Sequence, residues 1–130
     1  MKLTIVNGSP RHGKSNSGLP VELLLPFIQE KNEVNITHVG NYKSVDKYID
    51  EIVKADMLVF AFPLYVDSIP SHILYLMERI SENHRNGNCI IYVIVNNGFY
   101  EGEQNYIAVQ QMKFWCNDNG FVWGQGIGCG

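Results

Sequence analysis

The chain has 130 residues, of which 45% are hydrophobic and 18% are charged, and its formal net charge is -3. This length predicts one domain, residues 1–130, and the composition is typical of a soluble globular protein rather than a disordered or membrane chain. Because the 10 Lys and Arg are spread among 13 Asp and Glu, the sequence does not predict the concentrated basic surface of a nucleic-acid-binding protein.

Five short apolar runs are predicted as strands, and they alternate with longer segments that have helical spacing. This alternation indicates βαβ units and a parallel sheet. Two of the runs are apolar without alternation, so we expect them to be central strands with both faces covered by helices. The predicted strands are residues 2–7, 34–39, 57–62, 89–96 and 120–124 or a little beyond, and the two central ones are 57–62 and 89–96.

The segments between these strands carry apolar residues three and four positions apart, which predicts amphipathic helices. Pro26 lies inside the first of them, so we expect a kink or a short helix there. Ser68 is predicted to cap the third, with Pro70 in its first turn. The predicted helices are residues 23–30, 45–53, 73–80 and 104–117, and the last is expected to end at Asn119-Gly120.

The sequence stops soon after the fifth predicted strand, at Gly126-Ile127-Gly128-Cys129-Gly130. A fifth helix to cover that strand is therefore missing from the expected fold. We expect either a truncated product or a partner subunit that covers this face, and on the second interpretation a homodimer.

The first predicted loop contains a match to the P-loop pattern. Residues Gly8 to Ser15 satisfy G-x-x-x-x-G-K-S, in which backbone N–H groups cradle nucleotide phosphates and Lys14 would reach the terminal ones. A P-loop enzyme also needs a strand that ends in an Asp to hold magnesium. Neither central strand ends in one, and the nearest candidate, Asp67, lies in a predicted loop.

The same loop also has the composition of a site for a terminal monophosphate. Hydroxyl, amide and guanidinium groups are gathered there beside a predicted helix N-terminus, whose N–H groups favour a bound anion. Taken without its context, Gly8-Ser9-Pro10 can equally be an ordinary turn. The phosphate-binding groups are predicted to come from Ser9, Arg11, Ser15, Asn16 and Ser17.

Three segments of the chain resemble the flavin loops of one enzyme family. Asn7-Gly8-Ser9-Pro10-Arg11, followed by Gly13-Lys14-Ser15-Asn16-Ser17, resembles the first loop of NADPH-dependent FMN reductases and related flavodoxin-like NAD(P)H oxidoreductases. Residues 62–70 are similar to their second flavin segment, and residues 96–101 resemble their third. The resemblance spans almost the whole chain. It implies a flavodoxin-like α/β fold, a doubly wound five-stranded parallel sheet in the order 2-1-3-4-5.

The resemblance also implies FMN as the cofactor, with NADPH or NADH as co-substrate and a small molecule as electron acceptor. Ligands of open α/β sheets bind outside the carboxyl ends of the strands, where these three loops are expected. Since the flavin carries the redox chemistry, we expect no catalytic side chain. The ring is expected to lie between Pro63, Leu64, Tyr65 and Val66 on one side and Asn97, Gly98 and Phe99 on the other.

Two other functions stay open at this point. A flavodoxin-type electron carrier would share the fold and FMN, but such carriers are usually much more acidic than a net charge of -3. A P-loop phosphotransferase would use Lys14 and magnesium instead of a flavin.

The remaining polar residues indicate no further site. No stretch of the sequence is apolar for the roughly 20 residues of a membrane span, and the first apolar run is too short for a signal peptide. We therefore expect a cytoplasmic protein without a membrane partner. The four histidines are scattered, so no metal site or nucleophilic triad is expected. Three cysteines without ligand spacing, Cys89, Cys116 and Cys129, are expected to be reduced thiols.

Overall fold

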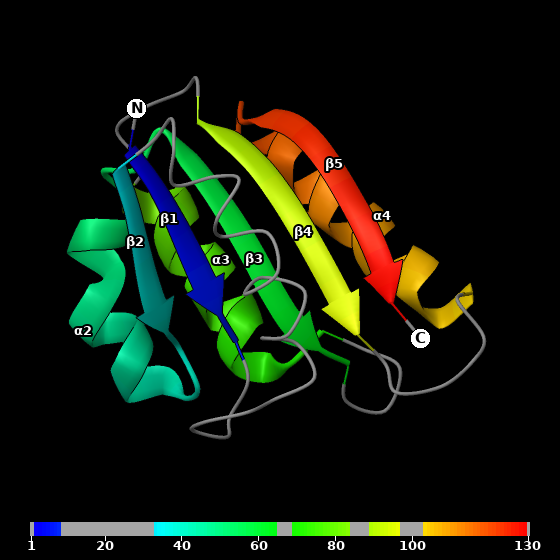
Figure 1. The fold of residues 1–130 in the computed structure, drawn as a ribbon, viewed down its shortest axis with the longest axis horizontal. Coiled ribbons are helices and arrows are strands. Elements are labelled where there is room, and N and C mark those ends of the chain that lie inside the picture. The colour runs from blue at the N-terminus through cyan, green and yellow to red at the C-terminus, as the bar shows by residue number, and fades with distance from the viewer. Residues whose placement is uncertain (1, 9–32, 65–68, 84–88, 97–102, 130) are drawn as a thin grey trace.

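The computed structural model describes residues 2–8, 33–64, 69–83, 89–96 and 103–129. Five parallel strands form one sheet in the order β2-β1-β3-β4-β5, as Figure 1 shows. This order confirms the doubly wound sheet that the resemblance implied. The strands are β1 (Lys2–Asn7), β2 (Glu33–His38), β3 (Met57–Pro63), β4 (Ile90–Asn96) and β5 (Val122–Cys129).

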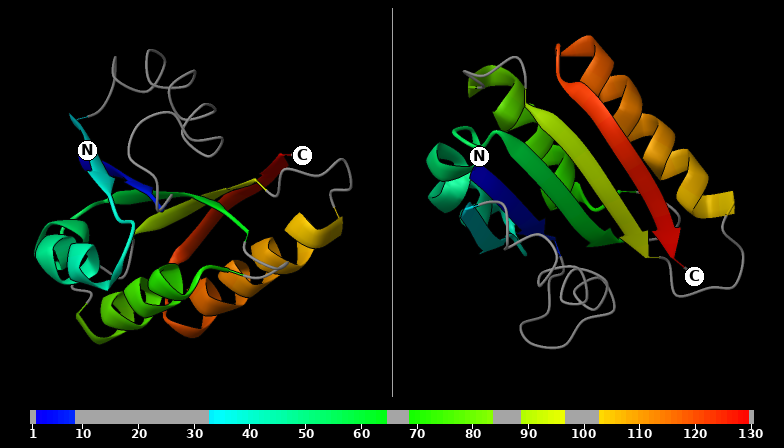
Figure 2. Two further views of the ribbon diagram at one scale, coloured as in Figure 1. Left: turned by 90° about the horizontal axis from the view of Figure 1, so that it is seen from below. Right: turned by 45° about the horizontal axis from the view of Figure 1, so that its top comes forward.

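Three helices in the described part of the chain cover one face of this sheet (Figure 2). They are α2 (Tyr42–Ile52), α3 (Ser71–Asn83) and α4 (Glu103–Asp118). The helix predicted at 23–30 lies outside the described residues. In the described helices no apolar run is long enough to span a bilayer.

Apart from β1, every described element differs by at least one residue from the bounds that the sequence predicts, and the fifth strand differs most. It begins at Val122 and continues to Cys129, whereas the sequence predicts 120–124 or a little beyond, because it pairs along the whole length of β4, with a bulge between Ile91 and Tyr92. Gly120 belongs to the turn after α4, where its φ of 75° is one that glycine adopts without strain.

Helix α3 begins one residue after Pro70, not before it. The carbonyl of Pro70 accepts a hydrogen bond from the backbone N–H of Leu74 at 3.1 Å. Accepting the first bond of the helix is the property of the N-cap position, so Pro70 takes the place that the sequence assigned to Ser68. The missing N–H of proline costs nothing at this position.

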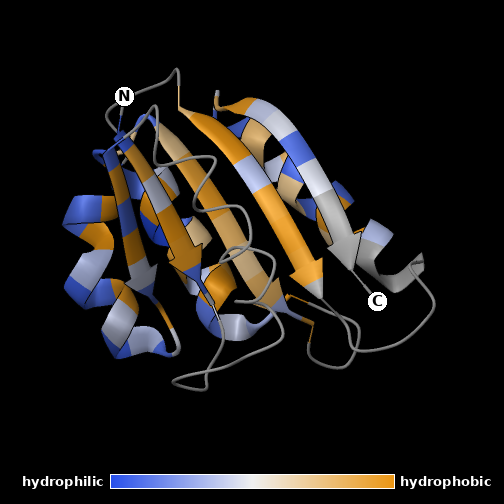
Figure 3. Cartoon of the chain, in the orientation of Figure 1, coloured by the Kyte–Doolittle hydropathy of each residue, from blue (hydrophilic) through white to orange (hydrophobic). Residues whose placement is uncertain are grey.

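The central strands are buried on both faces, as their apolar sequences predict. On the helix side, Phe60 and Phe62 are fully buried in the larger of two core clusters. On the other side, a smaller cluster contains Val59 and Ala61. Figure 3 shows the resulting apolar bands along β1, β3 and β4. Such two-sided burial is typical of parallel sheets and explains why these strands do not alternate in polarity.

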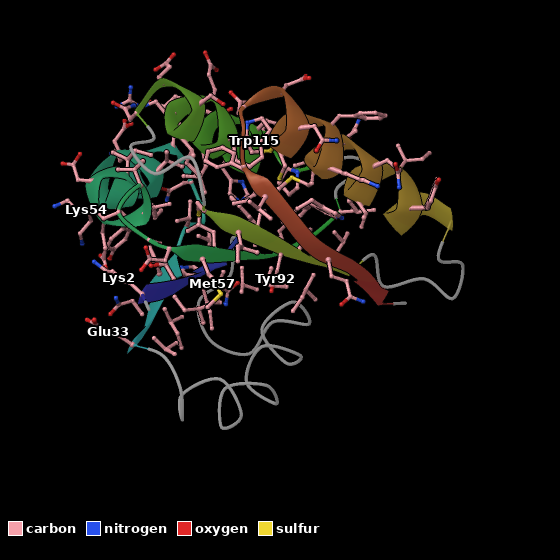
Figure 4. The ribbon with its side chains drawn as sticks, turned by 90° about the horizontal axis from the view of Figure 1, so that it is seen from above. Lys2, Glu33, Lys54, Met57, Tyr92 and Trp115 are labelled. Atoms are coloured by element: carbon pink, nitrogen blue, oxygen red, sulfur yellow. The ribbon has the colours of Figure 1, made fainter. Side chains whose placement is uncertain are left out.

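The side-chain view separates the two layers clearly (Figure 4). Met57 and Tyr92 lie on the side of the sheet away from the three helices, whereas Trp115 lies on the helix side. The indole N–H of Trp115 donates a hydrogen bond to Oγ of Ser81 at 2.8 Å. This bond joins α4 to the last turns of α3 across the larger core.

Replacing Thr4 by valine is expected to stabilise the fold. Thr4 is fully buried in β1, and among the described residues its hydroxyl oxygen has no hydrogen-bond partner. Valine has the same shape without the unsatisfied hydroxyl, so we expect the free energy of unfolding to rise by about 1 kcal/mol in urea titrations. Thr4→Ser keeps the hydroxyl and loses the methyl group, and should be less stable than the native protein. A less stable Thr4→Val protein would contradict this interpretation.

Candidate functional site

The carboxyl ends of three strands meet at one edge of the sheet, where Figure 1 places their arrowheads. In the β1–β3 ladder Asn7 pairs with Ala61, and in the β3–β4 ladder Pro63 pairs with Asn96. The three strands therefore end within two residues of one another. Since β2 lies on one side of β1 and β3 on the other, the chain connections diverge between β1 and β3. This divergence makes the topological switch point at which open α/β sheets bind ligands.

The described part of the chain includes few of the predicted ligand residues. Pro63 is the last residue of β3, and Leu64 follows it; both are half-buried. Leu64 also packs against the larger core cluster, so it is held in place where the second loop begins. Outside the described residues lie Ser9, Arg11, Ser15, Asn16, Ser17, Tyr65, Val66, Asn97, Gly98 and Phe99.

The start of the first loop is held by both neighbouring strands. The carbonyl of Asn7 accepts a hydrogen bond from the N–H of Val39 at 2.8 Å, on the β2 side. The N–H of Gly8 donates to the carbonyl of Ala61 at 2.7 Å, on the β3 side. The pairing thus continues to Val39 on the β2 side and to Gly8 on the β3 side. These two bonds fix the position at which the loop begins.

Gly8 also lies so close to its neighbours that a side chain at this position would force them to shift. A Cβ atom at this position would lie 2.6 Å from Cδ1 of Ile73 and 2.9 Å from Cβ of Phe62. Ile73 comes from the first turn of α3 and Phe62 from the end of β3, and both are fully buried. The glycine therefore allows α3 to pack directly on the departing chain.

A histidine from α3 completes this arrangement. Nε2 of His72 lies 2.6 Å from the carbonyl oxygen of Gly8, and only 6% of the residue is exposed. A carbonyl oxygen can only accept, so Nε2 carries the hydrogen and donates it.

Sequence reasoning missed His72 because it considered the histidines only as metal ligands or as members of a triad. A signal was present in the sequence. His72 lies on the same helix face as Ile73, Leu76 and Ile80, all of which are buried. A polar residue on the apolar face of a helix needs a buried partner, and this helix begins directly after a predicted flavin segment.

The described thiols lie at the opposite edge of the sheet. Cys89 comes directly before β4, and Cys116 lies in the last turn of α4; both are free and buried. Burial, with a smaller contribution from Asp56, raises the pKa of Cys89 to about 11. Burial, with a smaller contribution from Cys89, raises the pKa of Cys116 to about 12. Both thiols lie far from the carboxyl edge of the sheet, and their raised pKa values keep them in the uncharged form. Neither is therefore expected to take part in chemistry at that edge.

Comparison with known proteins identifies the fold. A sequence model of the family described as flavodoxin-like fold matches residues 1–106, which is most of the chain. No curated protein matches the chain significantly.

Solved structures of three proteins illustrate the likeness. The Trp repressor binding protein from Bacillus subtilis has a TM-score of 0.80 at 16% identity, over 98% of this chain and 85% of that chain. An azoreductase from Bacillus anthracis has a TM-score of 0.70 at 17% identity, over 98% and 86%. FerB from Paracoccus denitrificans, described as a flavoenzyme NAD(P)H:(acceptor) oxidoreductase, has a TM-score of 0.73 at 18% identity, over 95% and 74%. At these identities the likeness is one of fold.

Replacing Gly8 by alanine is expected to destabilise the protein, by about 1–3 kcal/mol, because the added methyl group overlaps Ile73 and Phe62. Ile73→Val removes the nearer of these atoms, Cδ1. In a double-mutant cycle measured by urea unfolding, the two changes together should therefore destabilise less than the sum of their separate effects. Strict additivity would show that the overlap with Ile73 does not cause the loss.

The two described thiols are expected to resist alkylation in the folded protein. Reaction requires the thiolate, and the raised pKa values keep both groups protonated at about pH 8. Iodoacetamide should leave Cys89 and Cys116 unmodified under native conditions and modify both in urea, as peptide mass spectrometry can measure. Equal rates in the two conditions would contradict the burial that raises these pKa values.

Proposed function

The chain belongs to the flavodoxin-like fold family, and on this premise we propose that it is an FMN-dependent NAD(P)H oxidoreductase. It would pass reducing equivalents from NADPH or NADH through FMN to a small-molecule acceptor. The observation that carries the proposal is the fixed start of two loops side by side at the switch point, one after Gly8 and one after Pro63. These are the two loops whose sequences resemble the phosphate and ring segments of FMN reductases.

The chemistry of the first loop fits the phosphate of FMN. Its sequence offers three hydroxyl groups, an amide and a guanidinium within nine residues after Gly8, which suits a dianion with several acceptor oxygens. The hydrogen bonds and contacts of Gly8 hold the first residue of this loop beside β3. A loop that starts from a fixed point loses less conformational freedom when it closes on an anion.

The second loop fits the flat ring of the flavin. It begins with Pro63, whose fixed φ and missing N–H suit the end of a strand, and with Leu64, which rests on the core. A rigid apolar start of this kind gives a ring a surface on which to stack. On this proposal Tyr65 and Val66 continue that surface, and residues 97–99 after β4 border the ring on its other side.

The protein's part in this reaction is binding and orientation. When bound, FMN takes up hydride from a nicotinamide and gives up electrons to an acceptor, so it supplies the redox chemistry itself. The side chains of the loops hold its phosphate, orient its ring and shield one side of it from water. FerB, a flavoenzyme NAD(P)H:(acceptor) oxidoreductase, and the azoreductase have the same fold, and they support a reductase among the functions that this fold serves.

The proposal is tested by titrating the purified protein with FMN and with riboflavin, which lacks the phosphate, and by mixing the FMN complex with NADPH. We expect retained flavin absorbance, and bleaching by NADPH at rates suited to turnover. Arg11→Ala should raise the Kd for FMN about ten-fold, the effect of losing a charged hydrogen bond, and change the Kd for riboflavin little. The control Lys14→Ala should leave both values within about three-fold, since in an FMN site this lysine would only add positive potential, whereas a P-loop would use it directly on the phosphates.

Three other outcomes would each replace this function. No retention of FMN by the native protein sinks the flavin proposal. FMN retained without bleaching by NADPH would favour an electron carrier. Protection against unfolding by ATP and magnesium, lost in Lys14→Ala, would favour a P-loop enzyme.

A further inference from the structure

We infer that His72 is a positioning residue for the flavin phosphate, acting through its hydrogen bond to the carbonyl of Gly8. This inference rests on the proposed function, because the phosphate is that of the FMN proposed above. His72 does not touch the cofactor on this interpretation. It fixes the peptide group from which the phosphate loop starts.

Gly8 is held at its N–H, its Cα and its carbonyl group. Its N–H donates to Ala61, its Cα packs against Phe62 and Ile73, and its carbonyl accepts from His72. The first two of these constraints fix where the residue lies. The third fixes how the following peptide group is turned, since a peptide group is planar and rotates as one unit. Among the described residues, the printed hydrogen bond to the Gly8 carbonyl comes from His72, and its loss would leave this rotation less restricted.

The hydrogen bond between His72 and Gly8 is buried, so losing it would leave a buried carbonyl without this donor. Only 6% of His72 is exposed, and its Nε2 lies 2.6 Å from the carbonyl oxygen of Gly8. A buried carbonyl that loses its donor must turn toward another donor or remain unsatisfied. Either change would alter the direction in which the chain enters the phosphate loop.

His72 also connects this peptide group to helix α3. Helix α3 follows the second predicted flavin loop, and it is anchored there by Ile69, which is buried, and by the bonds that the carbonyl of Pro70 accepts from Ile73 and Leu74. His72 lies in the turn that these bonds form. It therefore joins the end of the ring loop to the start of the phosphate loop, across 64 positions of sequence. It acts there together with the contact of Ile73 with Gly8, which comes from the same turn of α3.

The test compares two replacements of His72 in the full chain. His72→Gln can place an amide N–H near the position of Nε2, whereas His72→Leu has a similar volume and no donor. For each variant the Kd is measured for FMN and for riboflavin by flavin fluorescence, and the ratio of the two values reports on phosphate binding alone. We expect His72→Leu to raise the Kd for FMN about ten-fold, the effect of one hydrogen bond, and that for riboflavin less than two-fold. His72→Gln should restore most of the loss.

A matched control separates positioning from stability. Ile80→Ala removes a buried side chain from the same helix, about two turns after His72, and should lower the urea midpoint without changing the ratio of the two Kd values. If His72→Leu weakens FMN and riboflavin equally, or if it changes neither, the inference is wrong while the proposed function stands. If the native protein binds no FMN, the proposed function fails and the inference fails with it.

A second measurement applies even if His72→Leu does not fold. The nitrogen chemical shifts of the His72 ring in the native protein report which nitrogen carries hydrogen. We expect hydrogen on Nε2, the atom that faces the Gly8 carbonyl, and its signal should move on FMN binding. A ring with hydrogen only on Nδ1 would overturn the inference directly, because such a ring cannot donate to this carbonyl.

Discussion

The close approach of α3 to the end of β1 is the constraint on which the carboxyl edge of this protein depends. A parallel sheet leaves the last residue of each strand at the same edge, but it does not decide how the chain continues from there. In this protein the direction of the chain is set at Gly8. Because glycine has no side chain, Phe62 from β3 and Ile73 from α3 can both pack directly against it. The turn that brings Ile73 also brings His72, so apolar packing and a buried hydrogen bond act on the same peptide group.

Sequence reasoning was most accurate where burial alone decides structure. The strand at Lys2–Asn7 and the central strands were predicted almost to the residue, because an apolar run that is buried on both faces of a parallel sheet has few alternatives. The fifth strand was placed too early. Its glycines have low strand propensity. They fit this strand because the side chains of Tyr92 and Val109 fill the space beside Gly124 and Gly126, where other residues would have a side chain. Packing of that kind cannot be read from a single segment.

The candidate site also contains residues that local sequence predicts and one contact that depends on packing. Its loop residues are predicted from local sequence, because hydroxyl groups, glycines and prolines after strands have direct chemical meaning, and of these residues the structure describes Pro63 and Leu64. Their placement at one edge followed from the strand order, which the structure has confirmed. His72 could not be assigned to the site in this way. Its place on an apolar helix face indicates a buried partner, but that partner, Gly8, lies 64 positions away in another βα unit, and the sequence does not identify it.

The bond between Trp115 and Ser81 has a practical meaning for spectroscopy. Ser81 lies near the end of α3, and His72 lies at its beginning. The indole is half-buried against Phe60 and Phe121, in a setting where its emission depends on the packing around it. Because α3 links the two positions, a shift of this helix at His72 is expected to change the emission of Trp115, which can be separated from that of Trp123 by replacing the latter.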